Sequence, residues 1–381
     1  MSDDKVASRW SDANFTHALA ETSWMASTAL LMHLNERATG DPARDWLSSW
    51  AHRWFVGDRL RVLVLGCGEG WLERVVAHWP FVARIDAVDL SVERAKALAP
   101  PNVHYAVADL NRDTLESNAY DVVVAHMILH HVENLEHALS EIEGAMKRDA
   151  TLIVNEYVGP KRFQFSDDVL DHINRLAHCL GIESRERPPL QLMIDLDPSE
   201  AVRSDEIVPM LRERFEILEQ KNLGGTILQH LLYGIVQDFP FEAPKKRAMI
   251  ELMCRYEATL VDRGAIPCDF VICAGRKRGS SVTKMNRPLP PRPEAALDVD
   301  PDPILWRIGV SPVRTDAGVC PPLDARSTRI LLASKQPRRA NLFNETRLGN
   351  LLARFRKIHL DPNDKDDRAL LALAHAIHSL G

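Results

Sequence analysis

Val62-Leu-Val-Leu-Gly-Cys-Gly-Glu-Gly70 combines the signal of a buried strand with that of a glycine-rich turn. The four apolar residues, half of them β-branched, predict a short buried strand, and three glycines at alternating positions follow at once. Gly66 and Gly68 allow the chain to turn sharply and close to a ligand, because no Cβ stands in the way. The apolar spacing of Trp71–Trp79 predicts a helix whose N-terminal amides face that ligand.

Strands and helices alternate outward from this turn, which predicts an α/β fold. The expected strands are Arg61–Leu65, Arg84–Asp89, Val103–Ala106, Tyr120–Ala125 and Ala150–Glu156. The expected helices between them are Trp71–Trp79, Val92–Ala99 and Leu135–Lys147. Such alternation implies a doubly wound, Rossmann-like and mostly parallel sheet with helices on both faces. The spacing of Phe215–Gln220 and Asp269–Ala274 favours two further strands that pair antiparallel at the edge.

The chain divides into four segments. Residues 1–58 are expected to form a helical N-terminal cap, with helices over Phe15–Asn35 and Pro42–Trp54. Residues 59–279 hold the α/β domain, with an insertion at about 157–212 that includes a helix near Asp167–Leu180 and a break at Pro188-Pro189. A Pro-rich linker at 280–304 precedes a basic, partly helical C-terminal extension at 305–381, with helices expected over Glu345–Ile358 and Asp367–Leu380.

Composition narrows the class of protein. The 381 residues are 45% hydrophobic and 26% charged, which is ordinary for a globular protein, and the formal net charge of -6 gives no reason to expect nucleic acid. No apolar run reaches the length of about 18 residues that a membrane span needs. The six cysteines form no CxxC pair, so we expect a reducing, cytoplasmic location.

Carboxylates stand at the ends of successive predicted strands. Asp89 ends the second strand, 23 residues after Gly66, where an acid can bind two ribose hydroxyls. Asp109 follows the third strand, where a carboxylate beside a backbone amide can bind adenine. His126 ends the fourth strand. The carboxyl ends of parallel strands meet at one edge, where such folds bind ligands.

Two classes of adenine-nucleotide ligand could bind at this edge. A dinucleotide site needs G-x-G-x-x-G, with the third glycine allowing close packing of helix and strand. Here that position is Trp71, and the glycines read G-x-G-x-G. The pattern therefore favours a ligand that contains adenosine without a pyrophosphate over a nicotinamide cofactor.

These residues resemble the class I S-adenosylmethionine-dependent methyltransferases. The resemblance rests on four motifs in order over roughly 60–275: Leu65-Gly-Cys-Gly-Glu-Gly70, Val88-Asp89-Leu-Ser, Ala108-Asp109-Leu-Asn, and Tyr120-Asp-Val-Val-Val with Leu129-His-His-Val. The stretch Glu156-Tyr-Val-Gly-Pro-Lys-Arg-Phe-Gln164 is similar to a bacterial subgroup with an EYVGPxRFQ motif, whose members often accompany sugar and polysaccharide genes. Asp197-Pro-Ser-Glu-Ala-Val-Arg203 and Gly224-Gly-Thr-Ile-Leu fit the same subgroup.

The resemblance implies roles for the residues that match. The methionine end of S-adenosylmethionine would be wrapped by Gly66, Cys67, Gly68 and Gly70. Asp89 would hold the ribose, Asp109 and the Leu110 amide would hold the adenine, Leu90 would pack on its face, and His126 would line the pocket. The implied activity is methyl transfer to a small-molecule or carbohydrate-linked acceptor, with oxygen as the favoured atom. The alternative is a non-catalytic scaffold or sensor that binds the cofactor and acts through its tail.

An already activated methyl group mainly needs an aligned acceptor, and a hydroxyl acceptor is helped by a base. His130 and His131 are candidates for that base, with a purely structural pair as the alternative, and Glu156 is the next candidate. Tyr157, Arg162 and Gln164 are candidates for acceptor contacts, although Arg162 could instead pair with Asp167 or Asp168.

Metal and partner interactions are also considered. His126, His130 and Glu133 could suggest a metal cluster, but a strand end spoils the helical spacing of such ligands, so no metal is expected. The apolar stretch Thr226–Val236 favours core packing or a homodimer face. The basic tail is expected to be solvated, with docking onto an acidic partner or onto the core itself as alternatives.

Overall fold

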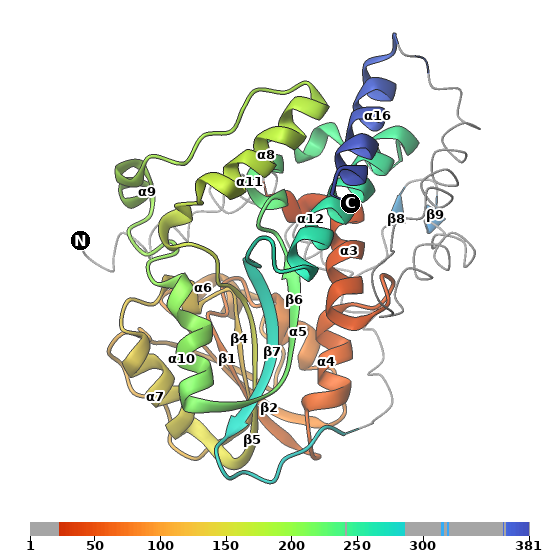
Figure 1. Ribbon diagram of the computed structural model, residues 1–381. Helices are drawn as coiled ribbons and strands as arrows, with labels where there is room; N and C mark the ends of the chain where they lie inside the picture. The colour runs from red at the N-terminus through yellow and green to blue at the C-terminus, as the bar shows by residue number, and fades with distance from the viewer. Residues whose placement is uncertain are drawn as a thin grey trace.

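The computed structural model describes residues 23–240, 242–285, 314–315, 318–319, 361 and 363–380. A seven-stranded sheet with the order β3-β2-β1-β4-β5-β7-β6 forms its centre (Figure 1). The strands are β1 Leu60–Leu65, β2 Val82–Asp89, β3 Val103–Val107, β4 Tyr120–His126, β5 Met146–Tyr157, β6 Phe215–Gly224 and β7 Phe270–Lys277. A two-stranded ribbon, β8 Arg314–Thr315 with β9 Gly318–Val319, stands apart from it.

The first five strands pair in parallel, and β7 runs antiparallel to both β5 and β6. The predicted mostly parallel, doubly wound sheet is therefore confirmed. The antiparallel pairing of the two late strands is confirmed as well, with β7 inserted between β5 and the edge strand β6.

Successive residues of β1 point to opposite faces of the sheet, since side chains alternate along a strand. Val62 and Val64 belong to one hydrophobic cluster, whereas Leu63 and Leu65 belong to the other. Helices α7 Leu135–Ala145 and α10 Ile207–Arg214 cover the second cluster. Helices α4 Trp46–Trp54, α5 Trp71–Val76 and α6 Glu93–Ala97 contribute to the first. This burial on both faces explains the continuous apolar character of the central strands.

The described part of the predicted cap consists of η1 Trp24–Ala26, α3 Thr28–Thr39 and α4. The helix expected over Phe15–Asn35 differs, because the chain is extended at Ser27 and α3 continues to Thr39, where Gly40 ends it in the left-handed conformation. Residues 15–22 lie outside the described residues. Helix α4 begins at Trp46 because the Asp45 side chain accepts a hydrogen bond from the Ser48 amide at 2.7 Å.

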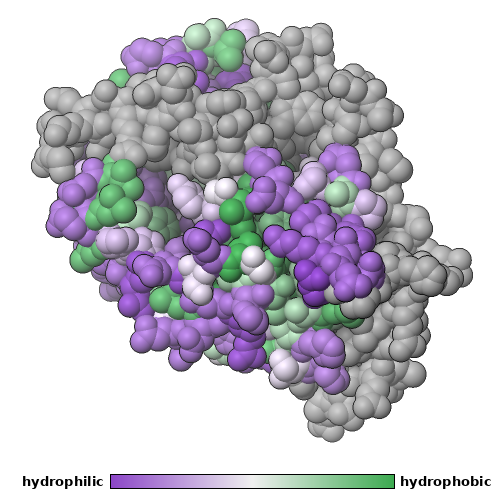
Figure 2. Space-filling model, turned by 90° about the horizontal axis from the view of Figure 1, so that it is seen from above, coloured by the Kyte–Doolittle hydropathy of each residue, from purple (hydrophilic) through white to green (hydrophobic). Residues whose placement is uncertain are grey.

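The insertion after β5 contains η3 Lys161–Phe163, α8 Asp167–Leu180, α9 Leu190–Leu196 and η4 Ser204–Glu206, and leads into α10. Helix α8 follows its prediction, with Ser166 and Gly181 as its caps. Helix α9 begins directly after Pro188-Pro189 and buries none of its residues. Leu190, Leu192 and Leu196 stay nearly half exposed. From above, Figure 2 shows a band of hydrophobic side chains among hydrophilic ones and another apolar patch on the side where Figure 1 places α9.

Between β6 and β7 lie α11 Leu228–Leu232, η5 Val236–Asp238 and α12 Pro244–Asp262. Ile227, Leu228, Leu231 and Leu232 are fully buried, so most of the apolar stretch Thr226–Val236 packs in the core of the chain. No helix in the part of the chain that the structure describes is long and apolar enough to cross a membrane.

Helix α16 Lys365–His378 packs against α12 and α8 (Figure 1). Its buried residues include Leu370 and Leu373, and its acidic first turn is paired with basic residues of α12. Lys245 lies 2.9 Å from Asp367, and Lys246 lies 2.9 Å from Asp366. The tail was expected to be solvated on a basic face, with docking onto the core as an alternative. For this helix the alternative is correct, and the docking uses acidic and apolar residues. The expected linker is described only over residues 280–285, and the helix expected over Glu345–Ile358 lies outside the described residues.

Candidate functional site

The glycine turn between β1 and α5 has a conformation that only glycine adopts without strain. Gly66, Gly68 and Gly70 have φ values of 68°, 52° and 78°. A Cβ on Gly66 would lie 2.5 Å from the Ile128 side chain, and one on Gly70 would lie 2.5 Å from the Tyr105 hydroxyl oxygen. The turn is tied to β2, because the Gly66 and Cys67 amides both donate to the Val88 carbonyl. Cys67 is buried beneath it.

Asp89 at the end of β2 shapes this turn. One carboxylate oxygen accepts a hydrogen bond from the Gly68 amide at 2.8 Å, and the other accepts from the Ser91 amide at 3.2 Å. Burial raises the pKa of Asp89 despite these bonds. The Asp89 side chain therefore joins the glycine turn to the backbone after β2, next to the half-buried Leu90, at the carboxyl edge of the sheet.

Asp109 follows β3 at the same edge and is 5% exposed. Its Oδ1 accepts from the Asn111 amide and from the Asn111 side chain, both at 2.9 Å. Arg112 lies 3.3 Å from its Oδ2. Leu110 is half-buried beside it. The adenine contacts of Asp109 and Leu110 remain predictions, and the bonds to Asn111 show how the loop holds the carboxylate.

His126, the last residue of β4, is enclosed by two tryptophans. Its ring centroid lies 5.1 Å from that of Trp46 in the cap and 5.4 Å from that of Trp71 in α5. Its Nδ1 is buried and has no hydrogen-bond partner among the residues that the structure describes. Burial lowers the pKa of His126 to about 4, so the ring is neutral at neutral pH.

A buried histidine–carboxylate pair joins the ends of β4 and β5. His130 lies in η2 Leu129–His131, and its Nδ1 contacts Oε1 of Glu156 in β5. Glu156 is fully buried, and its Oε2 accepts from the Ile128 amide at 2.8 Å and the Leu129 amide at 2.7 Å. Burial acts to raise the pKa of Glu156, but the charge of His130 and these hydrogen bonds outweigh it and lower the pKa. Burial acts in the opposite direction on His130, where Glu156 outweighs it and raises the pKa.

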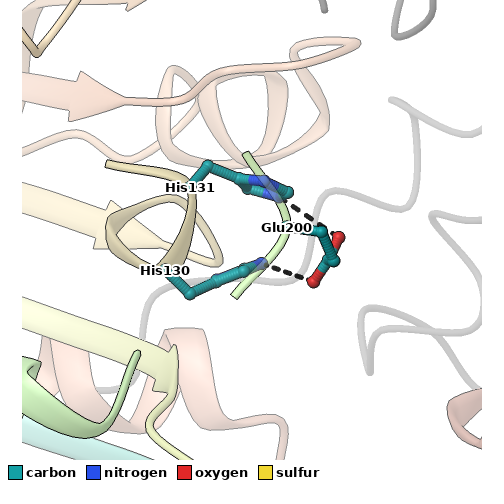
Figure 3. A group of neighbouring side chains, drawn as sticks. All are labelled: His130, His131 and Glu200. Carbon is teal, nitrogen blue, oxygen red and sulfur yellow. Dashed lines mark ion pairs between the residues drawn. The ribbon is translucent and has the colours of Figure 1, made fainter. Parts of the chain in front are cut away.

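His131 and His130 face one carboxylate from the insertion (Figure 3). His130 Nε2 lies 3.6 Å from Glu200 Oε1, and His131 Nε2 lies 3.9 Å from Glu200 Oε2. His131 Nδ1 is 3.2 Å from the Ser199 hydroxyl oxygen. Burial and the neighbouring His130 lower the pKa of His131.

Arg162 holds the loop that carries Glu200. Its guanidinium donates to the carbonyls of Asp197, Pro198 and Glu200 at 3.2, 2.6 and 2.8 Å. The predicted contact of Arg162 with an acceptor remains a prediction, since its side chain is committed to these carbonyls here. The suggested alternative, an ion pair with Asp167 or Asp168, is wrong, since Arg162 pairs with neither in the described part of the chain and Asp167 pairs with Arg187 at 2.5 Å.

The other two predicted acceptor contacts also serve the insertion. The Tyr157 hydroxyl donates to the Pro160 carbonyl at 3.1 Å, and the Gln164 side chain donates to the Arg162 and Pro188 carbonyls at 3.0 and 2.9 Å. Their role toward an acceptor remains a prediction. Met127, Arg162, Phe163 and Ala201 have positive φ values around this region, and strained backbone of this kind tends to gather at functional sites.

Sequence reasoning missed Ser199 and Glu200. The only signal was the segment Asp197–Arg203, which contributed to the family resemblance without any role for its residues. The metal cluster considered from sequence does not form: His130 is grouped with His131 and Glu200, whereas Glu133 is exposed.

The fold and the glycine turn define a doubly wound α/β domain with a candidate ligand site at its carboxyl edge. Comparisons with known proteins indicate which class of protein this domain resembles. Residues 63–154 match the family model described as "Methyltransferase domain". Together with its relatives, this match shows that residues 63–154 are similar to methyltransferase domains.

Two relatives illustrate the likeness. An uncharacterized methyltransferase of Mycobacterium tuberculosis is 33% identical over 101 residues, which is 26% of this chain and 51% of the relative. A malonyl-[acyl-carrier protein] O-methyltransferase of Halalkalibacterium halodurans is 28% identical over 134 residues, or 33% of this chain and 48% of that protein. The chain thus spans about half the length of the curated relatives it matches.

Among solved structures, an S-adenosylmethionine-dependent methyltransferase from Mesorhizobium loti is similar at 18% identity and a TM-score of 0.38. The match covers 61% of this chain and 97% of that one.

Proposed function

We propose that this protein transfers a methyl group from S-adenosylmethionine to an oxygen of a small-molecule or carbohydrate-linked acceptor. The observation that carries the proposal is the buried His130–Glu156 pair, at the same sheet edge as the glycine turn and Asp89. The Ile128 segment joins the two, because it packs against Gly66 and donates a backbone amide to Glu156.

In this proposal the cofactor binds across the ends of β1, β2 and β3. The amides of the turn from Gly66 to Gly70 hold its methionine end, and Asp89 accepts hydrogen bonds from the ribose. Asp109 and the Leu110 amide bind the adenine, with Leu90 against its face. His126 lines the pocket as a neutral group, because burial keeps its pKa low.

When bound, S-adenosylmethionine supplies an activated methyl group, so the protein needs chiefly to align an acceptor with it and to take up a proton. His130 or His131 accepts the acceptor's hydroxyl proton at Nε2. Glu156 is a positioning residue for His130, because its contact with Nδ1 fixes the ring and stabilises the imidazolium that forms. Free cysteines at every position that the structure describes support our assignment to a reducing cytoplasm.

Calorimetric titration with S-adenosylmethionine and S-adenosylhomocysteine tests the binding half of the proposal. Asp89→Ala should weaken binding more than about tenfold, since a hydrogen bond to a charged group contributes about 1.5–3 kcal/mol. Asp171→Ala, which removes an exposed carboxylate on α8, is the matched control and should bind as wild type. Equal affinity of the Asp89 variant and the wild type would refute the site.

A turnover assay on metabolite and glycan extracts tests the catalytic half, with formation of S-adenosylhomocysteine as its readout. His131→Ala should retain cofactor binding and slow turnover. Binding without any product would favour the alternative of a non-catalytic cofactor-binding scaffold.

A further inference from the structure

His130, His131 and Glu200 bring two imidazoles and one carboxylate to a single point. The candidate donor atoms, one from each residue, all lie within 4.8 Å of one another. Figure 3 shows both rings directed at the same carboxylate, the histidines from η2 and Glu200 from the insertion. This donor set is one that divalent transition metals such as Zn²⁺ bind in proteins.

The outer contacts of both rings favour the tautomer that a metal needs. His130 Nδ1 faces Glu156, so its proton lies on that side and Nε2 presents a lone pair to the Glu200 side. The Ser199 hydroxyl donates to Asp197 Oδ1 at 2.6 Å, which leaves its oxygen to accept from His131 Nδ1. Metal-binding histidines commonly have such a partner on their second ring nitrogen, which orients the ring and raises its basicity.

The donor atoms lie somewhat farther apart than ligands around one ion. Tetrahedral ligands about 2.0–2.1 Å from Zn²⁺ stand about 3.3 Å apart. His130 Nε2 lies 3.6 Å from Glu200 Oε1, and His131 Nε2 lies 3.9 Å from the other carboxylate oxygen, Oε2. With one donor atom from each residue the separations stay within 4.8 Å, so movements of up to about 1.5 Å by Glu200 and the two rings would bring the three donors to an ion.

The loop of Glu200 is built to hold that residue in place. Arg162 donates to three of its carbonyls, and the Arg162 amide donates to the Ala201 carbonyl at 2.8 Å. The Val202 amide donates to the His130 carbonyl at 3.0 Å, which joins the loop directly to the histidine segment. The side chains of His130, His131 and Glu200 are 5%, 14% and 21% exposed, so the site is shielded but open on the side of Glu200.

We propose that His130 Nε2, His131 Nε2 and Glu200 bind a divalent first-row transition metal, with Zn²⁺ as its probe. Three protein ligands leave a further coordination position for water or for the acceptor oxygen. Coordination would orient that oxygen and help it lose its proton to water, in place of transfer to a histidine, because the ion would occupy both Nε2 atoms. This catalytic role rests on the proposed function, whereas binding of the ion does not.

Binding is tested on the full chain, stripped with a chelator and then titrated with Zn²⁺ by calorimetry in the absence of cofactor and acceptor. The wild type should bind one equivalent, and Glu200→Gln should lower the affinity at least tenfold. Glu133→Gln is the matched control, because it removes an exposed carboxylate close to the histidines in the sequence, and it should bind as wild type. Substitution with Co²⁺ should give visible absorption bands of a four- or five-coordinate ion that Glu200→Gln weakens.

Two results would overturn the proposal: no stoichiometric binding by the wild type, or equal affinity of the wild type and Glu200→Gln. Either would mean that a proton on His130, paired with Glu200, accounts for this cluster. Cofactor titration of the same stripped protein separates the two ideas. Unchanged binding of S-adenosylmethionine with no metal site would refute the metal and leave the proposed function standing.

Discussion

Glu73 in α5 has an environment that makes it a sensitive test of the electrostatics beneath the glycine turn. Its side chain is fully buried, and neither carboxylate oxygen has a hydrogen-bond partner among the described residues. Burial raises its pKa to about 8. Replacement by glutamine keeps the shape of the side chain and removes its titration.

The direction in which the free energy of unfolding changes with pH follows from proton linkage. The folded state holds the Glu73 proton up to a pH of about 8, whereas the unfolded chain releases it near 4.5. Between these values the folded state binds more protons, so the free energy of unfolding falls as the pH rises. The loss amounts to about 3 kcal/mol at pH 7 and about 5 kcal/mol above pH 8, because one pKa unit corresponds to 1.36 kcal/mol.

Urea unfolding from pH 5.5 to 8.5, followed by circular dichroism without cofactor, measures this loss. Glu73→Gln should gain stability relative to the wild type by about 1.4 kcal/mol per pH unit up to pH 7.5, and the difference should level off above pH 8. Glu93→Gln is the control, because Glu93 is exposed and backbone hydrogen bonds lower its pKa, so it is ionised in both states across this range and its replacement should give a difference that does not change with pH. A difference between Glu73→Gln and wild type that stays constant with pH would refute the reasoning.

Three further substitutions test other parts of the structure. Gly70→Ala places a Cβ 2.5 Å from the Tyr105 hydroxyl at positive φ, so it should lower thermal stability and weaken cofactor binding, and a melting curve like that of wild type would contradict this. Leu373→Ala should cost about 2–5 kcal/mol in urea unfolding if the packing of α16 stabilises the chain, whereas a cost near zero would mean that it does not. Arg162→Lys loses the planar fork that binds the carbonyls of the Glu200 loop, and should lower Zn²⁺ affinity in calorimetry while leaving cofactor affinity intact; unchanged Zn²⁺ affinity would count against that positioning.

The sheet could be predicted because its signals are local. The strand that ends at Leu65 is apolar on both faces, and the glycine turn follows it directly. The hydrophobic pattern and the turn residues therefore predict the same end of the strand. Helix boundaries in the cap were less accurate, since the break at Ser27 has no strong sequence signal. Docking of the tail onto the core was only an alternative, and the basic charge of the tail did not indicate the contacts, which depend on Asp366 and Asp367 and on apolar residues that face α8 and α12.

The residues of the candidate site also fall into those that the sequence predicted and those that only the fold brings together. His130, His131 and Glu156 were predicted because they follow two strand ends that meet at one edge of the sheet. Glu200 was missed because it reaches the histidines only through the fold of the insertion, which no local spacing records. Arg162 was singled out for its charge, and its buried position shows that this charge serves the backbone of the loop around Glu200.

The position of α16 also has a consequence for how this chain is made. During translation, α8 and α12 leave the ribosome before the residues from 263 to 364 and well before α16 exists. The apolar surface that Leu370 and Leu373 finally cover therefore stays open to other nascent chains and to chaperones throughout that interval.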